Sequence, residues 1–391
     1  MLTVSAFYIK VPFGNWLFEK GLEAKKEWRL KEAVSYFKWS ARLGVKTDLA
    51  NFEEAYCHQL QGEYFRSQAQ LEKLLANSII SQELKGRILN VNGRNLFNQN
   101  KSDKALESHE ESLKIARLIN NRKLEAESLV GLSRVLYHTK GKFDEARNNL
   151  DRALAIGKEI NDELIIADAL RNIGVVLWWG NGELDRPLEQ FYKPALALYR
   201  KNGDLRSEAT MLSNISFIYS FKGDGFQHIK LQNQALAIRE KIGDRAGLSE
   251  SYRAQGSAYL SVRNFKKARE FLVRSADIAK KIGFSLAQNE AETYLAGVLV
   301  ELGEYDEAIR LFEQLLKRDK DSPVLAKSRL GSIANCHFLK GDYLKAREVF
   351  EQILEIELKS DLKDIRSISA LYVYLGNTYL HLDKLDRAKE H

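Results

Sequence analysis

The sequence predicts an all-α solenoid of about ten tandem helical hairpins. Only 4 of 391 residues are proline, and residues that favour helices fill the stretches between glycines. A phrase also recurs roughly every 40 residues along the chain, as in KGKFDEARNNL from Lys140, LGEYDEAIRLF from Leu302 and KGDYLKAREVF from Lys340. Each copy has a turn, an aromatic residue and then an alanine. A period of this length is typical of stacked helical repeats.

Two columns of small residues define each unit. The first column, at the alanine of the phrase, is filled by Ala33, Ser67, Ala105, Ala146, Pro187, His228, Ala268, Ala308, Ala346 and Ala388. The second, about twelve residues earlier, is filled by Gly21, Ala55, Gly93, Ser133, Gly174, Ser216, Gly256, Ala296, Ala334 and Gly376. Small side chains allow two helices to approach closely, and bulky residues three or four positions away fill the groove. We therefore expect each unit to be a helix A, a turn and a helix B. The bulky residues expected to fill the groove are Tyr137, Tyr219, Tyr259 and Tyr379 in helix A, and Phe37, Phe191, Phe312 and Phe350 in helix B.

The two ends of the chain depart from the repeat. Residues 1–14 do not fit a full unit and are predicted to be an N-terminal stub or cap, and residues 15–391 form the solenoid. The sequence ends at LDKLDRAKEH, the start of a tenth helix B, so the last repeat is truncated. Solenoids need polar capping repeats. We expect either a fragment of a longer protein or self-association through the uncapped C-terminal end.

The solenoid is expected to be irregular around residues 174–235. The fifth unit contains Trp178 and Trp179, followed by Pro187 and Pro194 in one helix B. Pro187 can occupy the first turn, but Pro194 lies further in and is predicted to kink or break the helix. In the sixth unit His228 replaces the alanine. These two units form either a hinge or a fixed change of curvature.

Composition narrows the class of protein. The two cysteines, Cys57 and Cys336, are far apart in the sequence and form no CxxC pair, which permits a reducing compartment. No apolar run is long enough for a membrane span. A net charge of +7 over this length is weak evidence for nucleic-acid binding. We expect a cytoplasmic protein with no direct nucleic-acid partner and no membrane partner.

Catalytic motifs are not found in the sequence. It contains no GxxxxGK[ST], GxGxxG, HExxH, GxSxG or EF-hand pattern, and its histidines lack metal-ligand spacing. Cys57 and Cys336 are each followed by a histidine, but consecutive helical residues point about 100° apart and cannot readily form a nucleophile–base pair. The two cysteines are predicted to pack between helices. We expect no enzyme activity, no cofactor and no metal.

These columns resemble the tetratricopeptide repeat (TPR) family. The resemblance rests on the small residues at the helix crossing, on an aromatic residue two positions after the turn glycine, and on the alanine that follows. The turn glycines are Gly62, Gly141, Gly182, Gly223, Gly303 and Gly341. The long repeats are similar to those of spindle-orientation adaptors, kinesin light chains and bacterial multidomain regulators. The resemblance implies a right-handed superhelix in which residues of helix A line a concave groove that binds peptides or partner domains.

Candidate binding residues follow from the position of that groove. It includes the residue just after the small residue of helix A and those three to four positions away. In units three to seven these are Arg94, Asn98, Arg134, Tyr137, Arg171, Trp178, Asn214, Phe217 and Arg253. Arginine can bind carboxylates through two hydrogen bonds, asparagine can hold a peptide backbone, and aromatic residues provide apolar anchors. Some of these arginines could instead form ion pairs with acids of adjacent helices.

The sequence favours a non-catalytic scaffold that binds a protein or peptide ligand, as the recognition part of a larger regulatory protein. One alternative is a bacterial peptide-sensing regulator of Rap-like type, although the first 50 residues show no recognisable helix-turn-helix or phosphatase bundle. A second is the sensory half of an enzyme, such as a CHAT protease, whose catalytic domain lies outside this sequence.

Overall fold

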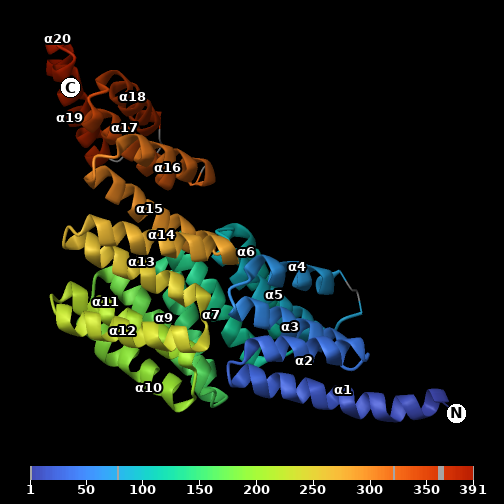
Figure 1. Cartoon of the computed structure of the whole chain (residues 1–391). Coiled ribbons are helices and arrows are strands. Elements are labelled where there is room, and N and C mark those ends of the chain that lie inside the picture. Colours follow the sequence, from blue (N-terminus) through green and yellow to red (C-terminus); the bar gives the residue numbers. More distant parts are fainter. Residues whose placement is uncertain (1, 77–78, 320–321, 360–364, 391) are drawn as a thin grey trace. The chain divides into compact units, whose positions relative to one another are not determined.

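The computed structural model describes residues 2–76, 79–319, 322–359 and 365–390, which are helical with short connections and contain no strand. Within these residues the helices follow one another as ten antiparallel hairpins, each with a helix A and a helix B. Figure 1 shows their succession along the chain. The predicted fold class is thereby confirmed. In the fifth hairpin, helix B consists of a π-helical turn, η1, and the α-helix α10.

The chain divides into two compact units. Unit 1 comprises Met1–Ser251 and Asp277–Ala287, and unit 2 comprises Tyr252–Ala276 and Gln288–His391. The helices of unit 1 are α1 (Leu2–Lys26), α2 (Leu30–Arg42), α3 (Thr47–Leu60), α4 (Tyr64–Leu75), α5 (Gln82–Asn98), α6 (Ser102–Leu118), α7 (Arg122–Thr139), α8 (Phe143–Glu159), α9 (Glu163–Asn181), η1 (Pro187–Tyr192), α10 (Lys193–Lys201), α11 (Leu205–Phe221) and α12 (Gly225–Ile242). The division passes through α13 (Arg245–Ser261), α14 (Phe265–Ile282) and α15 (Ser285–Glu301). The remaining helices of unit 2 are α16 (Tyr305–Arg318), α17 (Pro323–Lys340), α18 (Tyr343–Lys359), α19 (Ile365–His381) and α20 (Leu385–Glu390).

The first helix includes most of the residues expected to form an N-terminal stub or cap. Helix α1 begins at Leu2, contains Pro12 and ends at Lys26, so residues 2–14 are continuous with the first helix A. Met1 lies outside the described residues. From Leu17 onward, α1 packs into the core with α2 through Phe18, Ala24 and Phe37.

The predicted pairing of small and bulky residues is found at the helix crossings. A Cβ atom on Gly21 would lie 2.6 Å from the ring of Phe37, and one on Gly256 would lie 2.5 Å from Leu272. Such distances are far below van der Waals contact, so a larger residue would force the helices apart. The packing prediction made from the two columns is confirmed at these crossings.

The turns from helix A to helix B share one backbone conformation. The six predicted turn glycines all have positive φ, between +64° and +86°. In other units the left-handed position is taken by a residue with a side chain, such as Asn100, Arg263 or Asp383, with φ between 56° and 61°. Left-handed backbone strains most L-residues and not glycine. The turn glycines are therefore explained by the left-handed backbone conformation that the turn requires.

Pro194 does not break its helix, so the break predicted for the fifth unit is not found, although the helix is irregular just before this residue. Residues Pro187–Tyr192 form a π-helical turn, and α10 continues from Lys193 with Pro194 in its first turn. A π-turn absorbs one extra residue and relieves the missing hydrogen bond of a proline. It also shifts the register. Tyr192 faces Gly174, where an added Cβ would lie 2.3 Å from its ring, so Phe191 is not the residue at this crossing.

His228 makes a polar helix crossing in the sixth unit. Its Nδ1 lies 2.7 Å from the hydroxyl of Ser216 and 3.1 Å from the carbonyl oxygen of the same residue. Ser216 and His228, which belong to the two small columns, are thus joined here by hydrogen bonds, because a histidine occupies the place of the alanine.

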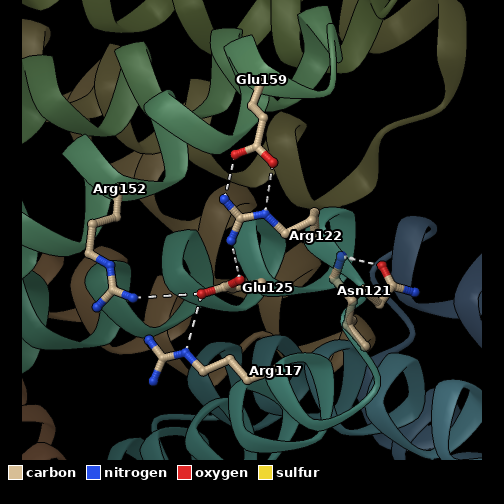
Figure 2. Close-up of polar contacts among 7 residues, drawn as sticks. Arg117, Asn121, Arg122, Glu125, Arg152 and Glu159 are labelled. Carbon is tan, nitrogen blue, oxygen red and sulfur yellow. Dashed lines mark hydrogen bonds and ion pairs between the residues drawn. The ribbon is translucent and has the colours of Figure 1, made fainter.

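Ion pairs connect adjacent hairpins of unit 1. Glu125 of α7 is buried and accepts hydrogen bonds from Nε of Arg117 at 3.2 Å and from Nη1 of Arg122 at 2.7 Å (Figure 2). Arg152 of α8 approaches the same carboxylate at 3.6 Å, and Arg122 also binds both oxygens of Glu159. The network joins α6, α7 and α8. It satisfies a buried charge, which a single partner would do less well.

Unit 1 also closes on itself through residues far apart in the sequence. The ring of Tyr64, at the start of α4, meets Phe284 edge to face at 5.4 Å. Ile282 packs against Gly62, and Phe65 packs against Gly283. We call Gly62, Tyr64, Phe65, Ile282, Gly283 and Phe284 the closing contact. It joins the second hairpin to the turn after α14, so two segments far apart in the sequence lie in contact within unit 1.

Candidate functional site

Charged and aromatic side chains from distant helices of unit 1 meet on its inward faces. Arg134 of α7 lies close enough to Tyr64 of α4, Arg171 of α9 and Glu250 of α13 for their charges to act on it. Arg206 of α11 is close to Tyr64, to Glu250 and to Tyr56 of α3. We call this set the inner face, and its members are Tyr56, Tyr64, Arg94, Glu127, Arg134, Asp168, Arg171, Arg206 and Glu250. The arginines among them are half-buried, so their charges are partly withdrawn from water.

Arg134 is a half-buried cation of the inner face that has an aromatic partner and no acidic one at contact distance. Its guanidinium lies over the ring of Phe97, 4.6 Å from the centroid, and within the described residues no carboxylate forms an ion pair with it. Burial lowers the pKa of Arg134, and the nearby charge of Arg171 acts in the same direction. A half-buried cation without an acid partner at contact distance loses part of its hydration, and an anionic ligand would offset part of that cost.

Arg171 differs because it has partners of its own. Its Nη2 lies 3.3 Å from Oδ1 of Asp168, and its Nε donates to the hydroxyl of Tyr199 at 3.2 Å. That hydroxyl in turn donates to Asp168 at 2.6 Å. Burial opposes the charge, but Tyr199 and Asp168 raise the pKa of Arg171 above its ordinary value. Arg206 is likewise close to an acid, Asp244, at 3.7 Å.

Helix α5 brings Arg94 and Asn98 to the inner face. The two residues are four positions apart and so lie on one side of the helix. Arg94 forms no ion pair with the described residues. Its charge acts on Glu127: burial raises the pKa of this carboxyl group, and Arg94 offsets part of the rise. Asn98 is 4% exposed, and its Oδ1 has no hydrogen-bond partner among the described residues. This oxygen is free to accept a hydrogen bond from a ligand.

Tyr137, Trp178 and Phe217 belong to an aromatic cluster near the ends of helices A. The hydroxyl of buried Tyr137 donates to Oδ1 of Asn172 at 2.8 Å, and its ring meets Trp179 edge to face. Trp178 contacts Phe217 and Phe221 at centroid distances of 6.4 and 5.5 Å. Trp179 and Phe221 are 45% and 67% exposed, so the cluster offers apolar surface to solvent.

The last two predicted residues lie apart from these groups. Asn214 of α11 is half-buried, and its amide forms no hydrogen bond within the described part of the chain. Arg253 belongs to unit 2, where its Nε lies 3.2 Å from Glu290 and its guanidinium lies 5.9 Å from the ring of Tyr294. The structure therefore groups Arg134, Tyr137 and Arg171 around one region and leaves Arg253 in the other unit.

The groove prediction missed the acids of the inner face and the residues of the closing contact. Glu127, Asp168 and Glu250 each lie six positions before the small residue of their helix A, as Arg87 does in α5. This position lies one helical turn before those from which the groove residues were predicted. The charged residue that recurs there in four helices A could have identified these groups from the sequence. Tyr64 and Arg206 carried no such signal, because they reach the inner face through the closure of unit 1.

The described residues provide no arrangement for metal or thiol chemistry. No group of three or more His, Cys, Asp or Glu side chains among them is placed to hold a metal ion. Cys57 and Cys336 are fully buried, as predicted, and burial raises their pKa values to about 12 and about 11. None of the described helices is long and apolar enough to cross a membrane.

Unit 2 contains a hollow of its own. It has a volume of about 660 Å³ and is lined by residues of α18, α19 and the turn and helix that follow, among them Arg347, Glu351, Tyr379 and Arg387. Its central charges are already matched, because Tyr379 donates to Glu351 and Arg347 lies 3.6 Å from the same carboxylate. For this reason the inner face of unit 1 is the stronger candidate.

Comparison with known proteins establishes the family. The tetratricopeptide repeat model matches residues 84–159, 207–281 and 288–359, which together exceed half of the chain. The chain therefore belongs to the tetratricopeptide repeat family. No curated protein sequence matches it significantly.

Among solved structures, the chain is similar to the apo form of RapI, with 16% identity, a TM-score of 0.51, and coverage of 69% of this chain and 98% of that one. It is also similar to the signal transduction ATPase with numerous domains (STAND) protein with a tetratricopeptide repeat sensor from Pyrococcus horikoshii, with 17% identity and a TM-score of 0.48. That match covers 94% of this chain, which spans about half (53%) of the Pyrococcus protein. The apo quorum sensor NprR from B. thuringiensis matches with 16% identity and a TM-score of 0.49, over 87% of this chain and 95% of that one. At these identities the similarity concerns the fold.

Proposed function

We propose that this chain is a non-catalytic recognition module that binds an extended peptide segment on the inner face of unit 1. The observation that carries the proposal is the gathering of half-buried arginines, acids and aromatic residues from α4, α5, α7, α9, α11 and α13 in one region. The repeat packing explains the small and bulky columns. It does not require charges on the inward faces.

An extended peptide fits the chemistry of this region. Its backbone offers N–H groups to Asn98 and carbonyl groups to the arginines, and its apolar side chains can pack on the exposed faces of Trp179 and Phe221. Asn214 adds a further amide from α11. This assigns binding to Arg94, Asn98, Arg134, Arg171, Trp178, Asn214 and Phe217, with Tyr137 supporting the site through Asn172. The proposed setting is the cytoplasm, within a larger regulatory protein.

Selection of peptides followed by crosslink mapping tests the proposal. A random peptide library displayed on phage is selected against the full chain, and the most enriched peptide is synthesised with a photoreactive benzoylphenylalanine. We expect crosslinks on α5, α7 and α9 at inward positions. Crosslinks confined to the helices B, α6 and α8, would contradict the inner face as the site, as would the absence of any enriched peptide.

The Rap-like alternative predicts a further result in the same system. A sensor of that type contracts around its peptide, so small-angle scattering should show a smaller radius of gyration when the selected peptide is bound. A scaffold with a fixed inner face would give the same radius with and without peptide.

A further inference from the structure

Helix α1 is longer than its partner α2. It has 25 residues against 13 in α2, and α2 packs against its second half. The packing begins at Gly14, whose carbonyl oxygen accepts a hydrogen bond from the hydroxyl of Ser40 at 3.0 Å and where an added Cβ would lie 2.5 Å from Val45. We call residues 2–13, which precede this point, the N-terminal extension. They form about 18 Å of helix, and Figure 1 shows this end of α1 beyond the end of α2.

The N-terminal extension is apolar on most of its sides. Its sequence is LTVSAFYIKVPF, in which only Thr3, Ser5 and Lys10 are neither apolar nor aromatic. Thr3 and Lys10 are seven positions apart and so share one side of the helix, which leaves the other sides almost wholly apolar. Lys10, Pro12 and Phe13 are exposed, so the described chain does not cover this end of the extension. A helix that is apolar nearly all round is normally buried.

Exposed aromatic rings continue from the extension onto α2. The ring of Phe13 stacks on that of Trp16 at a centroid distance of 5.6 Å, and Trp16 meets Tyr36 of α2 edge to face at 6.4 Å. Trp39 stands three positions after Tyr36, on the same side of α2. Phe13, Trp16 and Trp39 are 51%, 49% and 52% exposed. We call Trp16, Tyr36 and Trp39 the aromatic belt.

The unmatched charges at this end of the hairpin are positive. No acid occurs in the sequence before Glu19. Lys10 is exposed and forms no ion pair with the described residues. The same holds for Arg42, whose guanidinium lies 5.0 Å from the centroid of the Trp39 ring. This end of the molecule therefore favours a negatively charged surface.

We propose that the N-terminal extension attaches the chain to an anionic lipid surface by lying between the headgroups and the acyl chains. Its length of about 18 Å is too short to span a hydrocarbon core of about 30 Å. A protein groove covers one apolar face of a docked helix, whereas lipid can cover several sides at once. Tryptophan and tyrosine prefer the level of the headgroups, which places the aromatic belt there. Lys10 and Arg42 then face the lipid phosphates.

Lipid attachment of this kind is separate from peptide binding, because none of these residues belongs to the inner face. The expectation of no membrane partner rested on the absence of a spanning segment, and an interfacial helix needs no such segment. Pro12 lies at the junction of the extension with the packed part of α1, where its ring removes one backbone hydrogen bond. The extension can therefore bend relative to the packed part.

Co-sedimentation of the full chain with vesicles tests the proposal. The chain should pellet with vesicles of phosphatidylcholine and phosphatidylglycerol in equal amounts. Binding should be at least threefold weaker to vesicles of phosphatidylcholine alone, because these lack net negative charge. A chain that stays in the supernatant with both kinds of vesicle would overturn the proposal, and equal binding to both would overturn the part assigned to Lys10 and Arg42.

Two pairs of substitutions separate this site from general apolar adhesion. The variant with Phe13→Ser and Trp16→Ser should bind the mixed vesicles at least tenfold more weakly. The control, with Phe226→Ser and Val262→Ser, removes apolar side chains that are 75% and 70% exposed elsewhere, and should change binding less than twofold. Equal losses in the two variants would reject the N-terminal extension as the site.

A single charge reversal tests the electrostatic part. Lys10→Glu should weaken binding to the mixed vesicles and leave binding to phosphatidylcholine vesicles unchanged. Lys31→Glu changes the net charge equally at an exposed lysine at the other end of α2, and should have a smaller effect. An equal loss for the two reversals would show that only the net charge of the chain matters, which contradicts the proposed orientation.

An environment-sensitive dye keeps the test valid if the serine variant folds poorly. The dye is attached at Phe13→Cys, or at Val262→Cys as the control, while the buried Cys57 and Cys336 stay unlabelled. Mixed vesicles should shift the emission to the blue at residue 13 and not at residue 262. The same emission with and without vesicles at residue 13 would overturn insertion.

A second copy of the chain is the alternative occupant of this apolar end. In that case the full chain would sediment without lipid as a dimer, which Phe13→Ser with Trp16→Ser would convert to a monomer, and it would not bind vesicles. That combination of results would overturn the lipid assignment and replace it with self-association.

Discussion

The same column of helix B is polar in parts of unit 1 and apolar in unit 2. Sixteen residues after the small residue of helix A stand His109 and Gln232 in unit 1, and Leu272, Phe312 and Phe350 in unit 2. All five side chains are buried. The repeat therefore requires a side chain of suitable size at this place, and its polarity differs from one unit to the other.

His109 shows the consequences of a polar side chain at this position of helix B. A Cβ atom on Gly93 or on Gly131 would lie 2.7 or 2.4 Å from its ring, so α5 and α7 both close on the imidazole. Its Nδ1 lies 3.0 Å from Oδ1 of Asn90, and burial lowers its pKa to about 3, with Arg94 and Arg134 acting in the same direction. The crossing in unit 1 is thereby sensitive to protons. The crossings of unit 2 formed by Leu272, Phe312 and Phe350 are not.

The largest effect is expected at the closing contact. Tyr64 is 1% exposed, and Tyr64→Ala should destabilise unit 1 by about 3 kcal/mol through the cavity left beside Phe284. Tryptophan fluorescence during urea unfolding reports this, because all five tryptophans lie in unit 1. Amide exchange should accelerate both in α4 and in residues 277–287. A change confined to α4 would show that the two segments are not coupled.

Two glycine-to-alanine substitutions compare a close helix crossing in unit 1 with an open helix position in unit 2. Gly131→Ala should cost up to about 3 kcal/mol, because its Cβ would overlap the ring of His109, which has no room to move. Gly331→Ala in α17 meets nothing within 4 Å and should stabilise its helix by about 0.5–1 kcal/mol. Denaturation followed by circular dichroism compares the two variants. Equal effects would mean that the close crossing in unit 1 is not formed.

Unit 1 should also lose stability in mild acid because of His109. In the folded state its pKa is about 3, below the ordinary value of 6.5, so unfolding takes up a proton between these values. The stabilising contribution is present above pH 6.5 and is lost as the pH falls toward 3. Between pH 7 and pH 5 the loss should be about 2 kcal/mol.

The variant His109→Leu, which places the residue of unit 2 in this column, provides the control. Its unfolding free energy should change by correspondingly less between pH 7 and pH 5 when monitored by tryptophan fluorescence. An identical pH dependence in the two proteins would contradict a buried neutral imidazole.

The smallest effect concerns a turn in unit 2. Arg263 has φ of 57° where other units have a turn glycine, so Arg263→Gly should stabilise the hairpin of α13 and α14 by about 1 kcal/mol. Gly303→Ala, at φ of 76° with nothing within 4 Å, should cost about as much. Native-state hydrogen exchange of α14 and α16 measures both. The same sign for the two changes would argue against backbone strain at this position.

Most of the fold follows from the sequence because packing fixes the period. The columns at Gly21, Gly174 and Gly256 place both helices of each hairpin, and the turn glycines mark where helix A ends. The π-turn before Pro194 was not predictable in the same way. A proline in a helix can be accommodated by a kink, a break or an extra residue, and the choice depends on which residue meets Gly174.

The site was only partly predictable for a related reason. The column after the small residue identified Arg94 and Arg134, and the spacing of Asp168 and Arg171 already suggests an ion pair. Whether an arginine has a partner from another hairpin depends on the closure of unit 1. That closure arises from small rotations added over successive repeats, which the sequence of one repeat does not specify.

Electron–electron resonance between two spin labels tests the central claim, that unit 1 closes on itself around the inner face. Labels at Arg66→Cys in α4 and Lys281→Cys in α14 stand beside the closing contact, while the buried Cys57 and Cys336 stay unlabelled. Closure predicts a single narrow distribution at short distance, which Tyr64→Ala should broaden. A broad distribution centred at long distance in the unaltered chain would contradict the closed unit, and with it the common region that gathers Arg134, Arg171 and Arg206.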